Sequence, residues 1–187
     1  MKISRRGFGL GAAAIVASPA IVTSARAQAV SLRLHHFLPP VSNAHAKLLA
    51  PWARKVEADS NGRLKIDSFP GMQLGGTPPQ LFDQARDGVA DIIWTLPGST
   101  PGRFSRTEVF ELPFIASNRG IVNARACAEF AEKHLGEETK EVKLLAFWAH
   151  DAGLIHANKQ VRTMDDLKGL KLRNPTRLAG EALKALG

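Results

Sequence analysis

One arginine combines a residue type and a position that suit the binding of an anion. Arg173 ends a predicted strand over residues 170–173, and Thr176 is a typical N-cap for a last helix. In open α/β sheets, ligands bind beyond the carboxyl ends of strands, where a helix N-terminus adds free N–H groups and a partial positive charge. A guanidinium there can hold a carboxylate through two parallel hydrogen bonds, which a lysine cannot do. The alternative is a surface arginine in an ion pair with Asp165 or Glu181.

The histidines and the single cysteine do not form a catalytic or metal-binding pattern. His35 and His36 are adjacent, so on a strand they point to opposite faces and cannot easily share a metal ion. Cys127 lies beside the apolar face of a predicted helix, which favours a small buried side chain over a reactive thiol. No glycine-rich nucleotide loop follows a strand. We therefore expect no catalytic residue, metal or cofactor. The other histidines are scattered, as is typical of structural residues: His45, His134, His150 and His156.

The charge balance argues against a nucleic-acid partner. The 187 residues carry 25 Lys and Arg against 17 Asp and Glu, a formal charge of +8. Four of the basic residues and no acidic residue fall in residues 1–27, so the charge of the rest is only +4. These charges are interspersed and do not form a basic stripe. A weakly positive chain suits an anionic ligand, and no nucleic-acid contact is expected.

The N-terminus has the pattern of an export signal. Ser4-Arg5-Arg6 is followed by Phe8 and Leu10, a sequence that resembles the bacterial twin-arginine signal. Residues 8–25 then carry no charge, and Ala-Arg-Ala at 25–27 offers small residues for cleavage. The alternative, a membrane anchor, would need a longer and more apolar run. We predict that residues 1–27 are a signal peptide recognised by the twin-arginine export machinery, and that the mature chain works in the periplasm.

Strands and helices alternate in the first part of the chain. Apolar patterns predict strands over residues 30–37, 64–69 and 91–96. Helices are expected between them, one capped by Ser42 or Asn43 and one opened by two prolines at 78–79. Pro51 should kink the first helix because it removes a backbone donor. This order predicts an α/β sheet with right-handed crossovers.

The second part of the chain has less regular patterns. Residues 104–114 predict irregular structure or a short strand, and residues 118–135 predict a helix. Buried strands are expected at 144–148, 153–157 and 170–173. The residues Thr-Met-Asp-Asp at 163–166 are typical of a capping box for one helical turn. Spacing places four residues of the expected helix on its buried face: Ile121, Ala124, Ala128 and Ala131.

An ordered series of short motifs resembles the solute-binding proteins of TRAP (tripartite ATP-independent periplasmic) transporters. The sequence DLKGLKLRNP at 166–175 is similar to the segment in which an arginine of these receptors holds the carboxylate of the ligand. Other similar motifs occur in the order of the family: VE at 56–57, NGRLKI at 61–66, FPGMQLGG at 69–76, ARDGVAD at 85–91 and VFELPF at 109–114. The resemblance covers nearly all of the chain after residue 27.

The resemblance implies a periplasmic-binding-protein-like α/β fold with two domains around a central cleft. Residues 28–151 would form the first domain, and residues 152–187 would begin a second domain that is truncated. A crossover would lie near residues 148–153. A small organic carboxylate would bind in the cleft through Arg173 and would be delivered to the TRAP membrane subunits. Apolar faces of an incomplete second domain would be exposed, so partial disorder is expected after about residue 152.

The same resemblance sets the other expected ligand contacts. Many receptors for sialic acid or dicarboxylates carry a second arginine where Ile155 stands here, so a ligand held by two arginines is not favoured. An apolar wall with one arginine suits a monocarboxylate that has a hydrophobic or ring-like body. Trp94 and Trp148 either pack in the core or line this wall. The expected contacts besides Arg173 are Phe37, Trp94, Leu96, Trp148, His156 and Asn174.

Two other classes of protein fit the sequence. The twin-arginine route often carries enzymes with cofactors, so an exported periplasmic enzyme is one alternative. A binding protein of another transporter class, or the input module of a sensor, is the other, because one fold can serve several partners.

Overall fold

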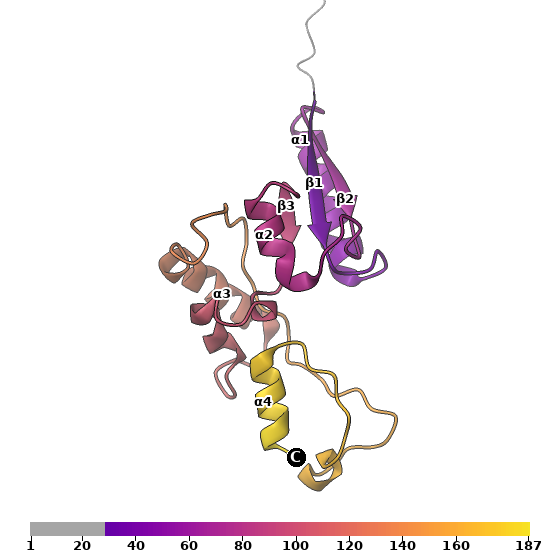
Figure 1. Cartoon of the computed structure of the whole chain (residues 1–187), viewed down its shortest axis with the longest axis vertical. Coiled ribbons are helices and arrows are strands. Elements are labelled where there is room, and N and C mark those ends of the chain that lie inside the picture. The colour runs from indigo at the N-terminus through magenta and orange to yellow at the C-terminus, as the bar shows by residue number, and fades with distance from the viewer. Residues whose placement is uncertain (1–28) are drawn as a thin grey trace, which may run out of the picture.

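A three-stranded parallel sheet forms the N-terminal part of the chain in the computed structural model, which describes residues 29–187 (Figure 1). β1 (Val30–His36) lies between β2 (Leu64–Phe69) and β3 (Ile92–Trp94), and both neighbours run parallel to it. The three strands predicted for this part are confirmed, and so is the mixed α/β class. The predicted twin-arginine signal lies outside the described residues.

Two helical segments connect the strands. The first is α1 (Ala50–Asp59), preceded by the π-helical turn η1 (His45–Leu49). Pro51 has no N–H, and directly before it the Ala50 N–H bonds to the His45 carbonyl, one residue further back than in an α-helix. The disturbance expected at Pro51 therefore takes the form of a widened turn. The second segment is α2 (Leu81–Arg86), preceded by the 3-10 turn η2 (Pro78–Gln80).

The core lies where the carboxyl half of β1 is covered on both faces. Leu34 and Leu81 have no exposed surface, and Phe82 packs edge-on against Phe104 with ring centroids 5.0 Å apart. Burial of such side chains supplies roughly 2 kcal/mol each from the hydrophobic effect. Because β1 is the central strand, its last three residues are all buried, whereas its amino end is exposed.

The region after the sheet is helical. The 3-10 turns η3 (Pro97–Ser99) and η4 (Ser105–Glu111) are followed by α3 (Gly120–His134), which confirms the helix predicted here. The short strand considered at 104–114 is wrong, because these residues close 3-10 hydrogen bonds such as that from the Thr107 N–H to the Phe104 carbonyl (3.0 Å).

The buried face of α3 agrees with the predicted one only at Ala131. Asn123, Cys127 and Ala131 are buried at a spacing of four, whereas Ile121 is 58% exposed. Asn123 can be buried because its side chain accepts the Ser117 N–H and donates to the Ser117 carbonyl, both at 2.8 Å. The buried face of α3 thus includes an asparagine whose carbonyl and amino groups are both hydrogen-bonded, where the pattern favoured only apolar residues. The prediction that Cys127 is buried is confirmed.

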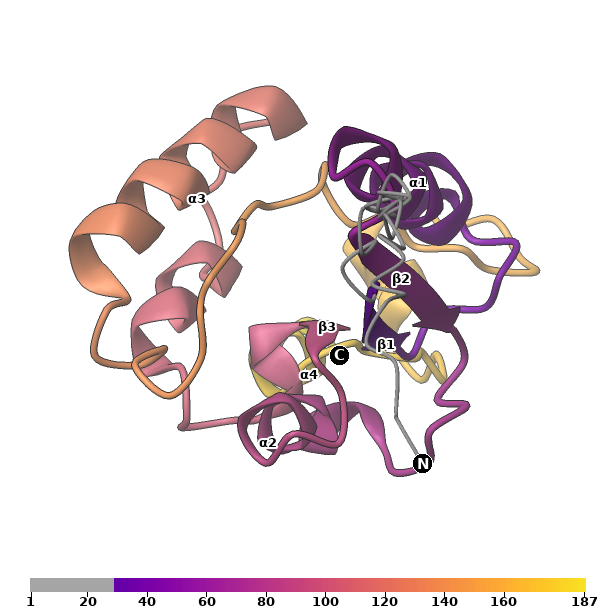
Figure 2. The ribbon, with the colours of Figure 1, turned by 90° about the horizontal axis from the view of Figure 1, so that it is seen from above.

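The segment that follows α3 runs as coil toward the end of the molecule that holds α4, without forming strands (Figure 1, and from above in Figure 2). The strands predicted at 144–148, 153–157 and 170–173 are therefore wrong for this structure. A strand needs a neighbour to satisfy its backbone groups, and among residues 29–187 none lies beside these segments. Their apolar residues remain partly uncovered, with Leu145 66% and Leu154 76% exposed.

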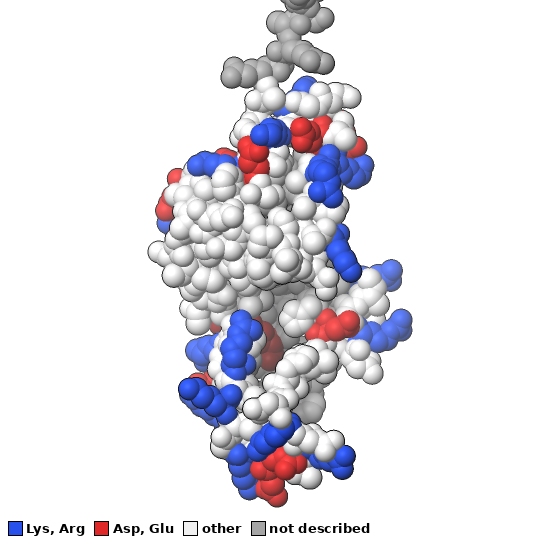
Figure 3. All heavy atoms as spheres, turned by 90° about the vertical axis from the view of Figure 1, so that its right-hand side faces the viewer, with Lys and Arg blue, Asp and Glu red and all other residues white. Residues whose placement is uncertain are grey.

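Two short helices complete the chain. η5 (Met164–Leu167) begins with the predicted capping box, in which Asp166 accepts the Thr163 N–H at 2.9 Å. α4 (Arg177–Ala185) is capped by Thr176, as predicted, and lies at the opposite end of the molecule from β2 (Figure 1). On one face of the molecule the charged residues gather toward the two ends and leave a broad uncharged region between them (Figure 3). Within residues 29–187, no helix has the length and apolarity that a bilayer crossing requires.

Candidate functional site

A cavity of about 400 Å³ lies between the carboxyl edge of the sheet and the start of α4. The parallel register places His36 opposite Trp94, so the chain leaves β1 and β3 side by side at this edge. The turn after β3 and the two prolines of η2 form one wall of the cavity. The residues that lead into α4 form the other wall. The lining residues are Phe37, Pro78, Pro79, Leu96, Gly98, Ser99, Pro101, Arg173, Asn174, Pro175, Thr176 and Arg177.

Arg173 is the predicted anchor, and it lines this cavity with an exposed side chain. The alternative of a surface ion pair is wrong, because both candidate carboxylates are bound to lysines. Asp165 pairs with Lys168 at 2.6 Å and Glu181 pairs with Lys184 at 3.2 Å. Within residues 29–187, no carboxylate lies within ion-pair distance of Arg173. Its guanidinium is thus available to an incoming anion.

The start of α4 is fixed beside Arg173 by close packing. Thr176 is 8% exposed, and its hydroxyl accepts the Ala179 N–H at 3.3 Å. Its methyl group packs against Gly98 so closely that a Cβ added to Gly98 would lie 2.5 Å from Thr176 Cγ2. The side chain of Asn174 packs in the same way on Gly180, 3.2 Å from where a Cβ would stand. Gly98 therefore lets the two walls of the cavity approach each other, and Gly180 lets Asn174 pack on α4.

A row of aromatic rings extends from the cavity to a partly exposed tryptophan. Phe37 lines the cavity, and its ring centroid lies 5.4 Å from that of Trp94. The Trp94 ring lies 6.3 Å from that of Trp148, which is 40% exposed. Aromatic neighbours at such spacing attract each other beyond simple burial. Both tryptophans thus stand behind the wall of the cavity.

The predicted contact residues do not all meet. Four of them line the cavity: Phe37, Leu96, Arg173 and Asn174. Trp94 and Trp148 reach it only through Phe37. His156 lies in the exposed stretch 151–160 and is not among the lining residues. Its assignment as a ligand contact stays a prediction without support from this geometry.

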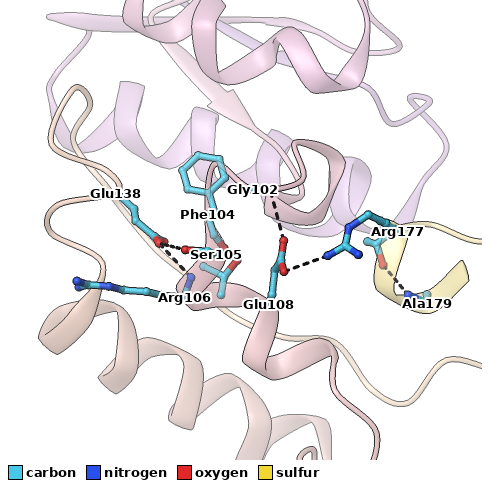
Figure 4. Close-up of polar contacts among 10 residues, drawn as sticks. Gly102, Phe104, Ser105, Arg106, Glu108, Glu138, Arg177 and Ala179 are labelled. Atoms are coloured by element: carbon cyan, nitrogen blue, oxygen red, sulfur yellow. Dashed lines mark hydrogen bonds and ion pairs between the residues drawn. The ribbon is translucent and has the colours of Figure 1, made fainter. Parts of the chain in front are cut away.

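Sequence reasoning missed one ionisable residue of the cavity. Arg177 follows the cap Thr176 and points from α4 toward η4, where its Nη2 lies 3.5 Å from Glu108 Oε2 (Figure 4). Glu108 Oε1 also accepts the Gly102 N–H at 3.4 Å. The position of Arg177 directly after a helix cap was a usable signal, whereas Glu108 lies 69 residues away in the sequence and gave none.

The two adjacent histidines hold the end of β1 in place. His35 Nδ1 donates to Gln84 Oε1 on α2 at 3.0 Å, and His36 Nε2 lies 2.9 Å from His45 Nδ1 on η1. They thus point to opposite faces, as predicted. Burial, with a smaller contribution from His45, lowers the pKa of His36 to about 4, and burial also lowers the pKa of His35. Within residues 29–187, no three His, Cys, Asp or Glu side chains gather as metal ligands.

The structure thus combines an α/β fold with a cavity at the carboxyl edge of a parallel sheet, where ligands of such folds commonly bind. Residues 34–187 match the bacterial extracellular solute-binding proteins, family 7, and the chain belongs to this family. Members of this family work outside the cytoplasm, so the expected periplasmic location is confirmed.

Solved structures of similar proteins agree with this assignment. A TRAP solute-binding protein from Rhodoferax ferrireducens T118, in complex with copurified benzoate, is 47% identical, with a TM-score of 0.80 over 84% of this chain and 49% of that chain. A marine metagenome TRAP solute-binding protein specific for aromatic acid ligands, in complex with 3-hydroxybenzoate, is 44% identical, with a TM-score of 0.81 over 85% of this chain and 50% of that chain. The resemblance to TRAP solute-binding proteins is thereby confirmed.

A curated relative belongs to the same group at lower identity. The C4-dicarboxylate-binding periplasmic protein DctP of Rhodobacter capsulatus is 26% identical over 99% of this chain and 56% of its own length. The chain thus spans about half the length of the relatives it matches.

Proposed function

We propose that this chain serves as a periplasmic receptor for an aromatic monocarboxylate, which it delivers to TRAP membrane subunits. The observation that carries the proposal is Arg173, which lines the cavity together with Phe37 and Leu96 and has no carboxylate partner among residues 29–187. A guanidinium can hold one carboxylate through two hydrogen bonds, and the face of Phe37 suits a ring. Two relatives with 44% and 47% identity hold 3-hydroxybenzoate and benzoate, which agrees with this chemistry.

Calorimetry with benzoate tests the anchor directly. Arg173→Ala should weaken benzoate binding by about 2–5 kcal/mol, because the ligand's carboxylate would remain buried without its partner. Arg173→Lys should recover only part of the loss, since an ammonium lacks the planar fork. Arg125→Ala, which removes an exposed arginine of α3, is the matched control and should bind like the unaltered chain. Equal benzoate affinities of the Arg173→Ala and Arg125→Ala variants would remove the basis of the proposal.

The proposal includes binding without turnover and export before binding. The chain belongs to a family of binding proteins, which supports reversible capture over catalysis. Benzoate incubated with the protein should be recovered unchanged by mass spectrometry.

The residues of the N-terminal pattern support twin-arginine export, so replacing Arg5 and Arg6 together by Lys should keep the protein in the cytoplasm. We also retain the division into domains at residues 151 and 152, with the cavity between them.

A further inference from the structure

The cavity has two arginines, and among the described residues 29–187 only one of them, Arg177, has a carboxylate partner. Arg173 and Arg177 are the ionisable residues among those that line it. Arg177 is paired with Glu108, whose carboxylate stands between α4 and the Gly102 N–H (Figure 4). The pair joins segments 69 residues apart, and Glu108 is only 25% exposed, whereas Arg177 is 52% exposed. Glu108 is therefore the fixed member of the pair, and Arg177 reaches to it from the cavity wall.

A second carboxylate adds negative charge behind the same wall. Glu111 lies three residues after Glu108 on η4, and its Oε1 packs against Gly98, a lining residue. Coulomb interactions act over several ångströms, so both carboxylates raise the cost of any anionic charge placed near Arg177. The cavity thus offers one unopposed positive charge, at Arg173, and a neutralised one at Arg177.

We propose that Glu108 is a specificity-determining residue that neutralises Arg177 and thereby restricts the cavity to ligands with one negative charge. This inference rests on the proposed function, since it concerns the charge of the acid that Arg173 holds. Without Glu108, Arg177 would face the cavity as a second cation and would favour an aromatic dicarboxylate. The ion pair disfavours the dianion in two ways. Arg177 no longer attracts the second carboxylate of the ligand, and the negative charge of Glu108 repels that carboxylate.

The test compares benzoate with isophthalate, which has the same ring and one additional carboxylate. Calorimetry on the whole chain should show benzoate binding at least about tenfold tighter than isophthalate. Glu108→Gln should shift the ratio of the two affinities toward isophthalate by about fivefold to tenfold, as expected for one charge at cavity distances. Glu129→Gln removes the same charge from an exposed ion pair on α3 and should leave the ratio unchanged. The shift should be smaller at about 1 M salt than at about 0.1 M salt.

Two further variants keep the inference testable if Glu108→Gln changes the packing of η4. Arg177→Gln should shift the ratio further toward benzoate, because Glu108 is then left without its cation. The double variant, Glu108→Gln with Arg177→Gln, should return the ratio close to that of the unaltered chain, since no charge then remains at the pair. Thermal unfolding of each variant checks that it is folded.

The outcomes separate this inference from the proposed function. If benzoate binds through Arg173 but Glu108→Gln leaves the ratio unchanged, Glu108 does not set specificity and the receptor function stands. If the unaltered chain binds isophthalate as tightly as benzoate, the inference is likewise wrong. If the unaltered chain binds neither acid, the proposed function is wrong and the inference falls with it.

Discussion

Gly98 marks the place where the two walls of the cavity touch, so Gly98→Ala should force them apart. The new Cβ would lie 2.5 Å from Thr176 Cγ2 and 3.1 Å from Thr176 Cβ, and it would collide with Glu111 Oε1. The carboxylate can swing away at little cost. Thr176 cannot, because it is 8% exposed and its hydroxyl caps α4.

The expected loss of stability follows from two contributions. Overpacking a filled site costs about 1–3 kcal/mol. If Thr176 rotates to make room, the helix cap is lost as well, which costs about 0.5–2 kcal/mol. Urea unfolding followed by circular dichroism should show a loss within the combined range. Hydrogen exchange should locate the increased opening at α4, and benzoate affinity should fall because Arg173 precedes this helix.

Matched variants separate the collision from a general effect of alanine. Gly136→Ala adds the same methyl group where no atom lies within 4 Å, so it should leave stability nearly unchanged. Thr176→Ser removes Cγ2 but keeps the capping hydroxyl, so Gly98→Ala combined with Thr176→Ser should be more stable than Gly98→Ala alone. Equal stability of Gly98→Ala and the unaltered chain would refute the packing argument. So would the absence of any recovery in the double variant.

The remaining predictions concern protonation, burial and local order. Lowering the pH from about 6.5 to about 4 should destabilise the fold by up to about 3 kcal/mol, because the unfolded chain takes up a proton at His36 that the folded chain does not accept. Unfolding at several pH values should show a weaker pH dependence of stability for His36→Gln. The variant His150→Gln, which alters an exposed ring, should keep the pH dependence of the unaltered chain. Burial raises the pKa of the Cys127 thiol, so a thiol reagent should react with it only after urea is added; rapid labelling of the folded chain would contradict its position. Leu34→Ala should cost about 2–5 kcal/mol in urea unfolding, since Leu34 has no exposed surface. Amides of residues 151–160 should exchange faster than those of β1 in hydrogen-exchange measurements, and equal protection of the two segments would contradict the exposure of residues 151–160.

The first part of the fold was predictable because its signals are local. Alternating strand and helix patterns located β1, β2 and β3, and the polar caps Thr163 and Thr176 marked two helix starts. The strands expected after residue 143 were not found. An apolar run indicates that its side chains are suited to burial, but it does not indicate which neighbouring strand would pair with the segment. Within residues 29–187 no strand pairs with these segments.

The candidate site could be predicted only in part, at the position where a single residue type suits the binding of an anion. Arg173 was indicated by its residue type, by the helix cap that follows it and by the resemblance to TRAP receptors, although the strand expected before it does not form. Glu108 and the contact of Gly98 with Thr176 could not be found this way, because they depend on how distant segments meet. Ile121 was misplaced for a related reason, since the pattern could not foresee that Ser117 would satisfy a buried asparagine.

The aromatic row gives the protein a built-in optical reporter. Two of its three tryptophans, Trp94 and Trp148, follow one another behind Phe37, and the third, Trp52, lies on α1. Indole emission responds to nearby charges and to water, so a ring-bearing acid that settles against Phe37 would change the emission of Trp94 directly and that of Trp148 through its neighbour. The intrinsic fluorescence of the unlabelled chain can therefore follow the arrival of a ligand in real time.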